Sequence, residues 1–224
     1  MSNEAVKTRR KLFSSPAFRQ EVAERLDLDT SQVTPQIDAL LQAGTIPCPH
    51  ANNAEALGTD GARILLAIGS QQARPASVVR VSERLGAMTM QIEFGNQTSA
   101  GPADIFPGSP SVSFEADLAE MIQKLWKAAY GPSRDGFRAI EASVLWSDER
   151  GSLLFGKLEQ FEKGRPRRTR IYASEKLGLP VLPGGAWDFV HLPTVGGTVF
   201  APLPLLGFFQ LLDKGVEGTA ASLR

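Results

Sequence analysis

The chain has 224 residues, of which 42% are hydrophobic and 21% are charged, proportions typical of a folded protein. Its 24 Lys and Arg balance its 24 Asp and Glu, so no overall positive charge attracts nucleic acid or anionic lipid. A single cysteine, Cys48, excludes an internal disulfide, and with two histidines the sequence predicts no metal site and no cofactor. No signal pattern or membrane-length apolar run occurs, which predicts a reduced, cytoplasmic protein that does not bind a membrane.

The first third of the chain is predicted to be helical. Ser15 and Pro16 have the order of a helix cap and a first helical residue, and apolar residues then recur at four-residue spacing, at Phe18, Val22 and Leu26. A second helix is expected to end at Gly44, which suits the left-handed position after a helix, and its apolar residues are Val33, Ile37, Leu40 and Leu41. Two more helices are expected, over 59–69 and 75–86.

The pattern changes near residue 88, where residues 88–94 alternate between apolar and polar as a half-buried strand does. After a Gly- and Pro-rich loop, Ser113 caps a helix that Gly131 ends, with one apolar face made of Phe114, Leu118, Met121, Ile122, Leu125 and Trp126. Runs 139–146 and 152–161 are typical of a hairpin, and residues 168–173 of a third strand.

Prolines interrupt the apolar tail from residue 179 to residue 212, so extended segments and a short helix over 205–212 are expected. The fold class predicted from these elements is α+β. A small helical domain over residues 1–88 precedes a domain over residues 89–224, in which a helix packs on an antiparallel sheet.

Residues 18–46 combine two amphipathic helices with a short break between them. The small Ala23 lies where the second helix would cross the first closely, and apolar residues flank the break or anchor the second helix: Val22, Leu26, Leu28, Val33, Ile37 and Leu40. This arrangement resembles the helix-turn-helix of bacterial DNA-binding regulators, and residues 43–46 resemble the usual exit into a wing or into the next element. The resemblance covers this segment only and implies a winged helix that binds double-stranded DNA.

In such a protein the second helix enters the major groove, where exposed Gln, Ser and Thr side chains can contact base edges. The side chains expected to do so are Ser31, Gln32, Thr34 and Gln36. Thr30 is expected to cap the helix, whose first backbone amides would also face a phosphate. An arm before the first helix would add positive charge for the DNA backbone or minor groove, through Lys7, Arg9, Arg10 and Lys11.

Two features leave an alternative open. Pro35 either kinks the second helix or begins it, with Thr34 as the cap. Residues 18–46 also contain only two basic residues, Arg19 and Arg25, against five acidic ones, Glu21, Glu24, Asp27, Asp29 and Asp38. A helical pair that packs within the fold or binds a protein partner is therefore the alternative interpretation.

A second basic element follows near residue 163. Residues 163–170 contain five basic and no acidic side chains, and the Gly-Arg-Pro at 164–166 resembles an AT-hook. The segment is either a solvated turn or a wing that contacts phosphates through Arg165, Arg167, Arg168 and Arg170.

No catalytic motif was found, and the residues Cys48-Pro49-His50 are expected to form a turn and not a metal site. The sequence therefore predicts a non-enzymatic, sequence-specific DNA-binding protein, a transcriptional regulator that acts as a homodimer on two half-sites. The alternative is a non-catalytic adaptor whose helical domain binds a protein. An enzyme of unrecognised type is the third possibility.

Overall fold

The computed structural model describes residues 2–49, 53–72, 74–94, 105–107, 112–130, 138–147, 153–162, 165–173 and 196–221. The helices are α1 (Ser2–Ser14), α2 (Pro16–Leu26), α3 (Thr30–Gln42), α4 (Asn53–Gly69), α5 (Pro75–Gly86), α6 (Phe114–Tyr130) and α7 (Pro202–Ala221). The strands are β1 (Thr89–Phe94), β2 (Ile105–Pro107), β3 (Arg138–Ser147), β4 (Leu153–Glu162), β5 (Arg165–Ala173) and β6 (Gly196–Phe200).

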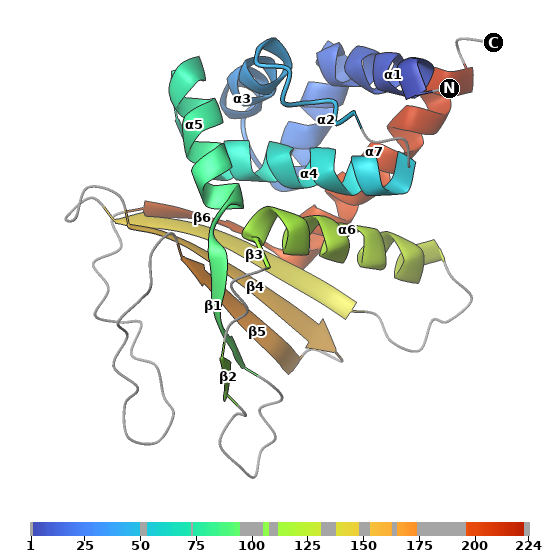
Figure 1. Cartoon of the computed structure of the whole chain (residues 1–224). Coiled ribbons are helices and arrows are strands. Elements are labelled where there is room, and N and C mark those ends of the chain that lie inside the picture. The colour runs from blue at the N-terminus through green and yellow to red at the C-terminus, as the bar shows by residue number, and fades with distance from the viewer. Residues whose placement is uncertain are drawn as a thin grey trace.

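The helices lie on one face of a six-stranded antiparallel sheet with the strand order β2-β1-β5-β4-β3-β6. Figure 1 shows α6 along this face, α4 above α6, and α1 and α3 farthest from the sheet. Helix α7 rises beside α2 and α1. The α+β class is confirmed, with the helical region first and the sheet with its packed helix after it.

One cluster of buried apolar side chains connects the two predicted domains. It includes residues from α2 and α3 together with residues from α6, β3, β4 and α7. Residue 88 marks the change from helix to strand, but the helices and the sheet on either side of it share this core. Among the described helices, none combines the length and the apolar character that a membrane span requires.

Local sequence explains most element ends. Helix α3 ends in a Schellman motif, in which the backbone N–H of Thr45 donates to the Leu40 carbonyl at 3.0 Å and that of Gly44 to Leu41 at 3.2 Å. The φ of Gly44 is +70°, a conformation that a side chain disfavours. Ser113 caps α6, because its hydroxyl accepts the Ala116 N–H at 3.2 Å.

Three expectations about helices were wrong. The arm over residues 7–11 belongs to helix α1, which the sequence analysis missed. Helix α4 begins at Asn53, and Thr59 lies inside it with its hydroxyl bonded to the Glu55 carbonyl. The last helix spans Pro202–Ala221 and is longer than predicted.

Helix α6 and the hairpin agree with prediction. Strands β3 and β4 pair antiparallel, with Ser147 opposite Leu153. Four residues of the predicted α6 face are buried, Phe114, Leu118, Met121 and Ile122, whereas the side chains of Leu125 and Trp126 lie outside the described part of the structure. The Phe114 ring lies against Gly156 of β4, where a Cβ would be 2.7 Å from it, so only glycine permits this approach.

Candidate nucleic-acid interface

Helices α2 and α3 are joined by residues 27–29, and local contacts fix the angle of the turn. Asp27 adopts a left-handed conformation with φ of 56°, and the Leu28 N–H donates to the Ala23 carbonyl at 2.9 Å. Ala23, predicted to lie where the helices cross closely, is buried. The cap of α3 is Asp29, whose backbone N–H donates to the Gln32 side-chain oxygen at 3.1 Å. Thr30 is thus the first helical residue and not the cap.

Helix α3 buries one face and exposes the opposite one. Its buried residues include the predicted anchors Val33, Ile37 and Leu40. Thr30, Ser31 and Gln32 of the first turn are exposed, and Thr34 is half-buried. Pro35 lies within the helix on the exposed side, so the alternative of a helix that begins there is wrong.

Gln36, expected to contact bases, belongs to the buried face. It is 6% exposed, and its side-chain amide donates to the Gln72 carbonyl at 2.8 Å, just beyond α4. Position 36 follows Val33 by three residues and precedes Leu40 by four, so helical spacing places it on their stripe. In this structure Gln36 is not available to a base.

The predicted basic arm forms part of α1, which places some of its basic side chains at the surface and one in the interior. Lys7, Arg10 and Lys11 are exposed, at helical spacing on one side. Arg9 is 1% exposed and points the other way, toward α4. A helix that presents Arg9 to α4 therefore presents the basic stripe of residues 7, 10 and 11 away from the core.

Arg9 forms a buried ion pair that ties α1 to α4. Its guanidinium donates to Asp60 at 2.7 Å and to the Cys48 carbonyl at 2.5 Å, while the Cys48 N–H donates to the other Asp60 oxygen at 2.6 Å. Burial raises the pKa of Asp60 to about 6, although the Arg9 charge and the Cys48 N–H oppose this rise. Arg9 thus holds the fold together and cannot contact DNA.

The described arginines of the basic strand β5 form ion pairs within the molecule. Arg168 and Arg170 lie on one face of the strand, as alternation predicts, and both bond to Glu93 of β1, at 2.9 and 2.8 Å. Arg170 also donates to both oxygens of Asp117 on α6, at 2.6 Å each. Burial alone would lower the pKa of Arg170, but the bonds and charge of Asp117 outweigh it and raise this pKa. The side chains of Arg165 and Arg167 lie outside the described residues.

Asp117 also accepts a hydrogen bond from the hydroxyl of Tyr172, whose ring packs at a tilt of 35° against the Phe114 ring with a centroid distance of 4.8 Å. Burial, with the charge and bond of Asp117, raises the pKa of Tyr172 well above its usual value. This network joins α6 to the sheet. It explains why Arg170 faces inward, and it leaves Arg168, 48% exposed, as the described β5 arginine nearest to solvent.

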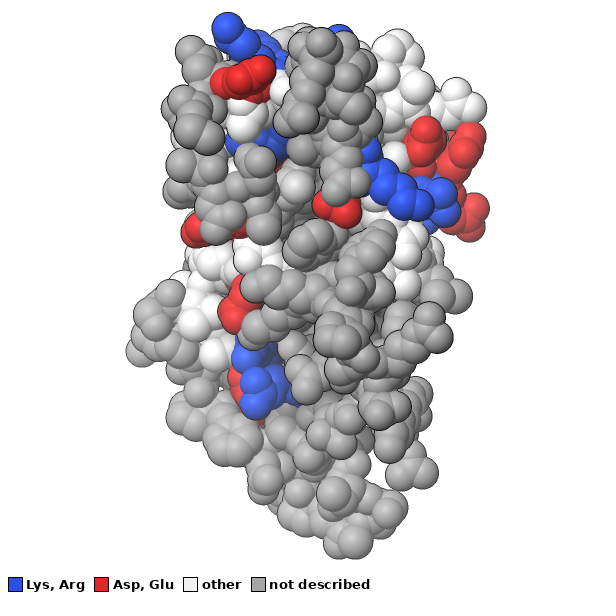
Figure 2. Space-filling model, turned by 90° about the vertical axis from the view of Figure 1, so that its right-hand side faces the viewer, with Lys and Arg blue, Asp and Glu red and all other residues white. Residues whose placement is uncertain are grey.

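The two predicted DNA-contacting elements lie on different sides of the molecule. Helix α3 packs on α4, α4 on α6, and α6 bonds to β5, so two helices separate α3 from β5 (Figure 1). Figure 2 views the molecule from the right-hand side of Figure 1. On this face the Lys and Arg side chains lie beside Asp and Glu, and its described residues form no continuous positive surface. Helix α3 and β5 therefore cannot share one groove.

Exposed acidic side chains precede α3 in the chain. Glu21 and Glu24 on α2 and Asp27 and Asp29 in the turn are all exposed. The exit from α3 passes through Pro49 toward α4, so the wing expected after Ile46 is not formed by the described residues there. Within the described part of the chain, no group of three or more His, Cys, Asp or Glu could hold a metal ion.

Comparisons of the chain with protein-family models, with curated proteins and with solved structures found no match.

Proposed function

We propose that the protein binds double-stranded DNA through the first turn of α3. The observation that carries the proposal is the geometry of α2, residues 27–29 and α3, in which one face of α3 is locked in the core while Thr30, Ser31 and Gln32 stay exposed. Short polar side chains at the start of a rigid helix have the reach and the chemistry to contact base edges in the major groove. The side-chain NH2 group of Gln32 stays available to donate to a base edge, because the contact with Asp29 uses only the side-chain oxygen.

The exposed stripe of Lys7, Arg10 and Lys11 supports the proposal. It lies opposite Arg9 on α1, and α1 and α3 both belong to the layer of helices farthest from the sheet (Figure 1). Helix α1 contacts α3, so these three cations would contact the phosphates of a duplex bound by α3 and position that helix without selecting a sequence. The β5 arginines are not part of this interface.

Selection from a random duplex library with the full-length protein tests the proposal. A shared motif in the enriched duplexes is expected, whereas recovery of no motif at low salt would overturn it. Replacing Lys7, Arg10 and Lys11 with Ala should then weaken binding to selected and random duplexes alike. It should flatten the slope of log affinity against log salt by up to about 2.7, since each phosphate contact contributes about 0.9.

A homodimer is part of the proposal, because one helix contacts few base pairs and two copies can bind two half-sites. Sedimentation of the protein with its selected duplex measures this stoichiometry. Two chains on a motif with two-fold symmetry is the expected result, and one chain on an asymmetric motif would refute the dimer.

The acidic residues that precede α3 favour a second candidate, a module that binds a basic protein surface. The double variant Asp27→Asn, Asp29→Asn separates the two functions, because Asn tolerates the left-handed conformation at 27 and caps a helix at 29. If phosphates lie near this turn, the loss of two negative charges strengthens DNA binding. If a basic protein binds there, the same change weakens that complex and leaves DNA binding absent.

A further inference from the structure

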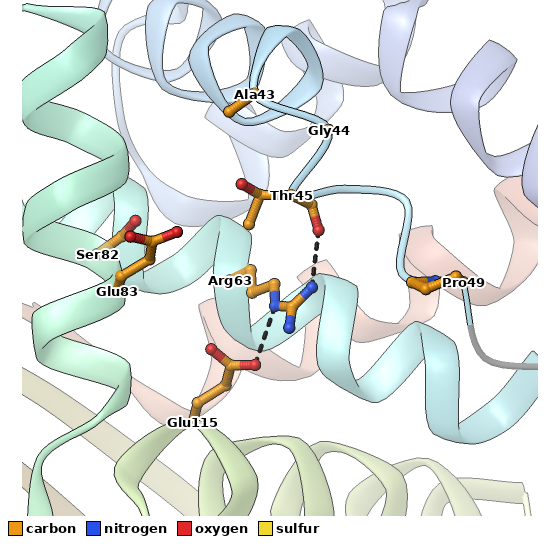
Figure 3. Close-up of a pocket in the computed structure, with 8 residues that line it drawn as sticks. All are labelled: Ala43, Gly44, Thr45, Pro49, Arg63, Ser82, Glu83 and Glu115. Atoms are coloured by element: carbon orange, nitrogen blue, oxygen red, sulfur yellow. Dashed lines mark hydrogen bonds and ion pairs between the residues drawn. The ribbon is translucent and has the colours of Figure 1, made fainter.

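A hollow lies where the end of α3 meets α4, α5 and α6 (Figure 3). Its volume is about 290 Å³, near the lower end of the range for small-molecule sites. The residues that line it come from five segments of the chain: Ala43, Gly44, Thr45, Pro49, Arg63, Ser82, Glu83 and Glu115.

The positive charge of Arg63 in this hollow is already satisfied. Its Nε donates to Glu115 at 2.9 Å, and its Nη1 donates to the Thr45 carbonyl at 2.7 Å. An anionic ligand would have to compete with Glu115 for this guanidinium. The Arg63–Glu115 pair therefore adds no net charge to the hollow. The bond from Arg63 to the Thr45 carbonyl also holds the segment that follows α3 in place.

Glu83 supplies an unbalanced negative charge. It is exposed on α5, and no described residue forms an ion pair or side-chain hydrogen bond with its carboxylate. Figure 3 shows this carboxylate pointing from α5 toward Thr45 and Arg63. With Arg63 and Glu115 paired, the lining carries one net negative charge.

The remaining polar groups are mostly acceptors. Among the described residues, the second oxygen of Glu115 and the Thr45 hydroxyl form no side-chain hydrogen bond. The hollow also lies at the negative end of the α3 dipole. The Ser82 hydroxyl donates a hydrogen bond to the Val79 carbonyl. A metal ion would find only two carboxylates here, and the described residues hold no larger ligand group.

We propose that this hollow binds a small organic cation with a primary ammonium or guanidinium group. The cation donates hydrogen bonds to the Glu83 carboxylate and the Thr45 hydroxyl, and its charge balances the lining. The Arg63–Glu115 pair stays closed beneath it. This site is independent of DNA binding, so its test needs no DNA.

Isothermal titration of the full-length protein tests the proposal, with putrescine and agmatine as probes and sodium succinate as the anionic comparison, all at one ionic strength. Saturable binding of at least one amine at one site per chain, without binding of succinate, is the expected result. Absence of saturable binding by both amines, or preferential binding of succinate, would overturn the proposal.

Two charge-matched variants locate the site. Glu83→Gln should weaken amine binding about tenfold or more, which corresponds to about 1.4 kcal/mol, because it removes the charged acceptor. Glu21→Gln removes the same charge from an exposed position on α2 and should leave the affinity within about twofold of the wild type. Equal affinities of Glu83→Gln and the wild type would refute the site even if the amine binds.

Discussion

Arg9→Met tests the assignment of Arg9 to the interior of the fold. Methionine keeps an unbranched side chain of similar length but removes the charge that lies 2.7 Å from Asp60. It also removes the donor to the Cys48 carbonyl. Both partners are buried, so water cannot replace these bonds without opening the contact between α1 and α4.

The expected loss follows from the burial of the pair, in which Arg9 is 1% exposed and Asp60 0%. Removing one partner of a buried ion pair costs about 3–5 kcal/mol, whereas replacing a solvent-exposed charge costs under about 1 kcal/mol. For a chain of this size the loss corresponds to a decrease in Tm of about 6–20 °C. The exposed neighbour Arg10 provides the matched control, Arg10→Met.

The pH dependence of the stability loss in Arg9→Met is a second, independent test of the buried pair. The pKa of Asp60 is raised from 3.8 to about 6 in the folded chain, so its protonated form stabilises the fold below about pH 4, and this contribution is lost as pH rises through 6. Arg9 opposes that rise, so the pKa of Asp60 is higher still in Arg9→Met. The stability difference between wild type and variant is therefore expected to be large at pH 7 and to shrink as pH falls toward 5.

Urea unfolding followed by circular dichroism measures both effects. The free energy of unfolding is compared for the wild type, Arg9→Met and Arg10→Met at pH 7 and pH 5. A loss in Arg9→Met within about 1 kcal/mol of the Arg10→Met value at pH 7 would refute the buried pair. A loss that grows on acidification would contradict the conclusion that Arg9 lowers the pKa of Asp60.

Four further substitutions test the core, the end of α3 and the network around Asp117 by the same urea assay. Leu118→Ala should cost about 2–5 kcal/mol, because the side chain is 1% exposed, and an unchanged midpoint would remove it from the core. Gly44→Ala should cost about 1–2 kcal/mol because φ is +70°, and a neutral result would contradict the left-handed cap of α3. Tyr172→Phe removes the donor to Asp117 and should cost about 1–3 kcal/mol, whereas Arg168→Ala, at a half-exposed position, should cost less than about 1 kcal/mol; the reverse order would contradict the network.

The sequence predicted an element correctly where its buried side chains are apolar and recur with the period of a helix or strand. Helices α2, α3, α5 and α6 were predicted from such stripes, with ends at Pro16, Gly44, Pro75 and Ser113. Helix α1 was missed because its buried face contains Thr8 and Arg9 beside Leu12 and Phe13, so apolar spacing does not reveal it.

The remaining site residues depended on contacts between distant parts of the chain. Asp60, which draws Arg9 inward, is 51 residues away, and Asp117, which does the same for Arg170, is 53 residues away. Alternation correctly placed Arg168 and Arg170 on one face of β5, but it does not say which face a helix covers. The burial of Gln36, by contrast, could have been predicted from the sequence. Its spacing from Val33 and Leu40 places it on their buried stripe, and only its polarity favoured an exposed position.

The most direct test of DNA binding by α3 is the affinity of one double variant, Ser31→Ala, Gln32→Ala, for a selected duplex and for a random one. Fluorescence anisotropy at fixed salt gives both constants, with Gln20→Ala on α2 as the control. If α3 contacts bases, the double variant binds the selected duplex at least about 30-fold more weakly, since each of two base contacts contributes about 1–3 kcal/mol, and its affinity for the random duplex is unchanged. Equal affinity of the wild type and the double variant for the selected duplex would contradict the account.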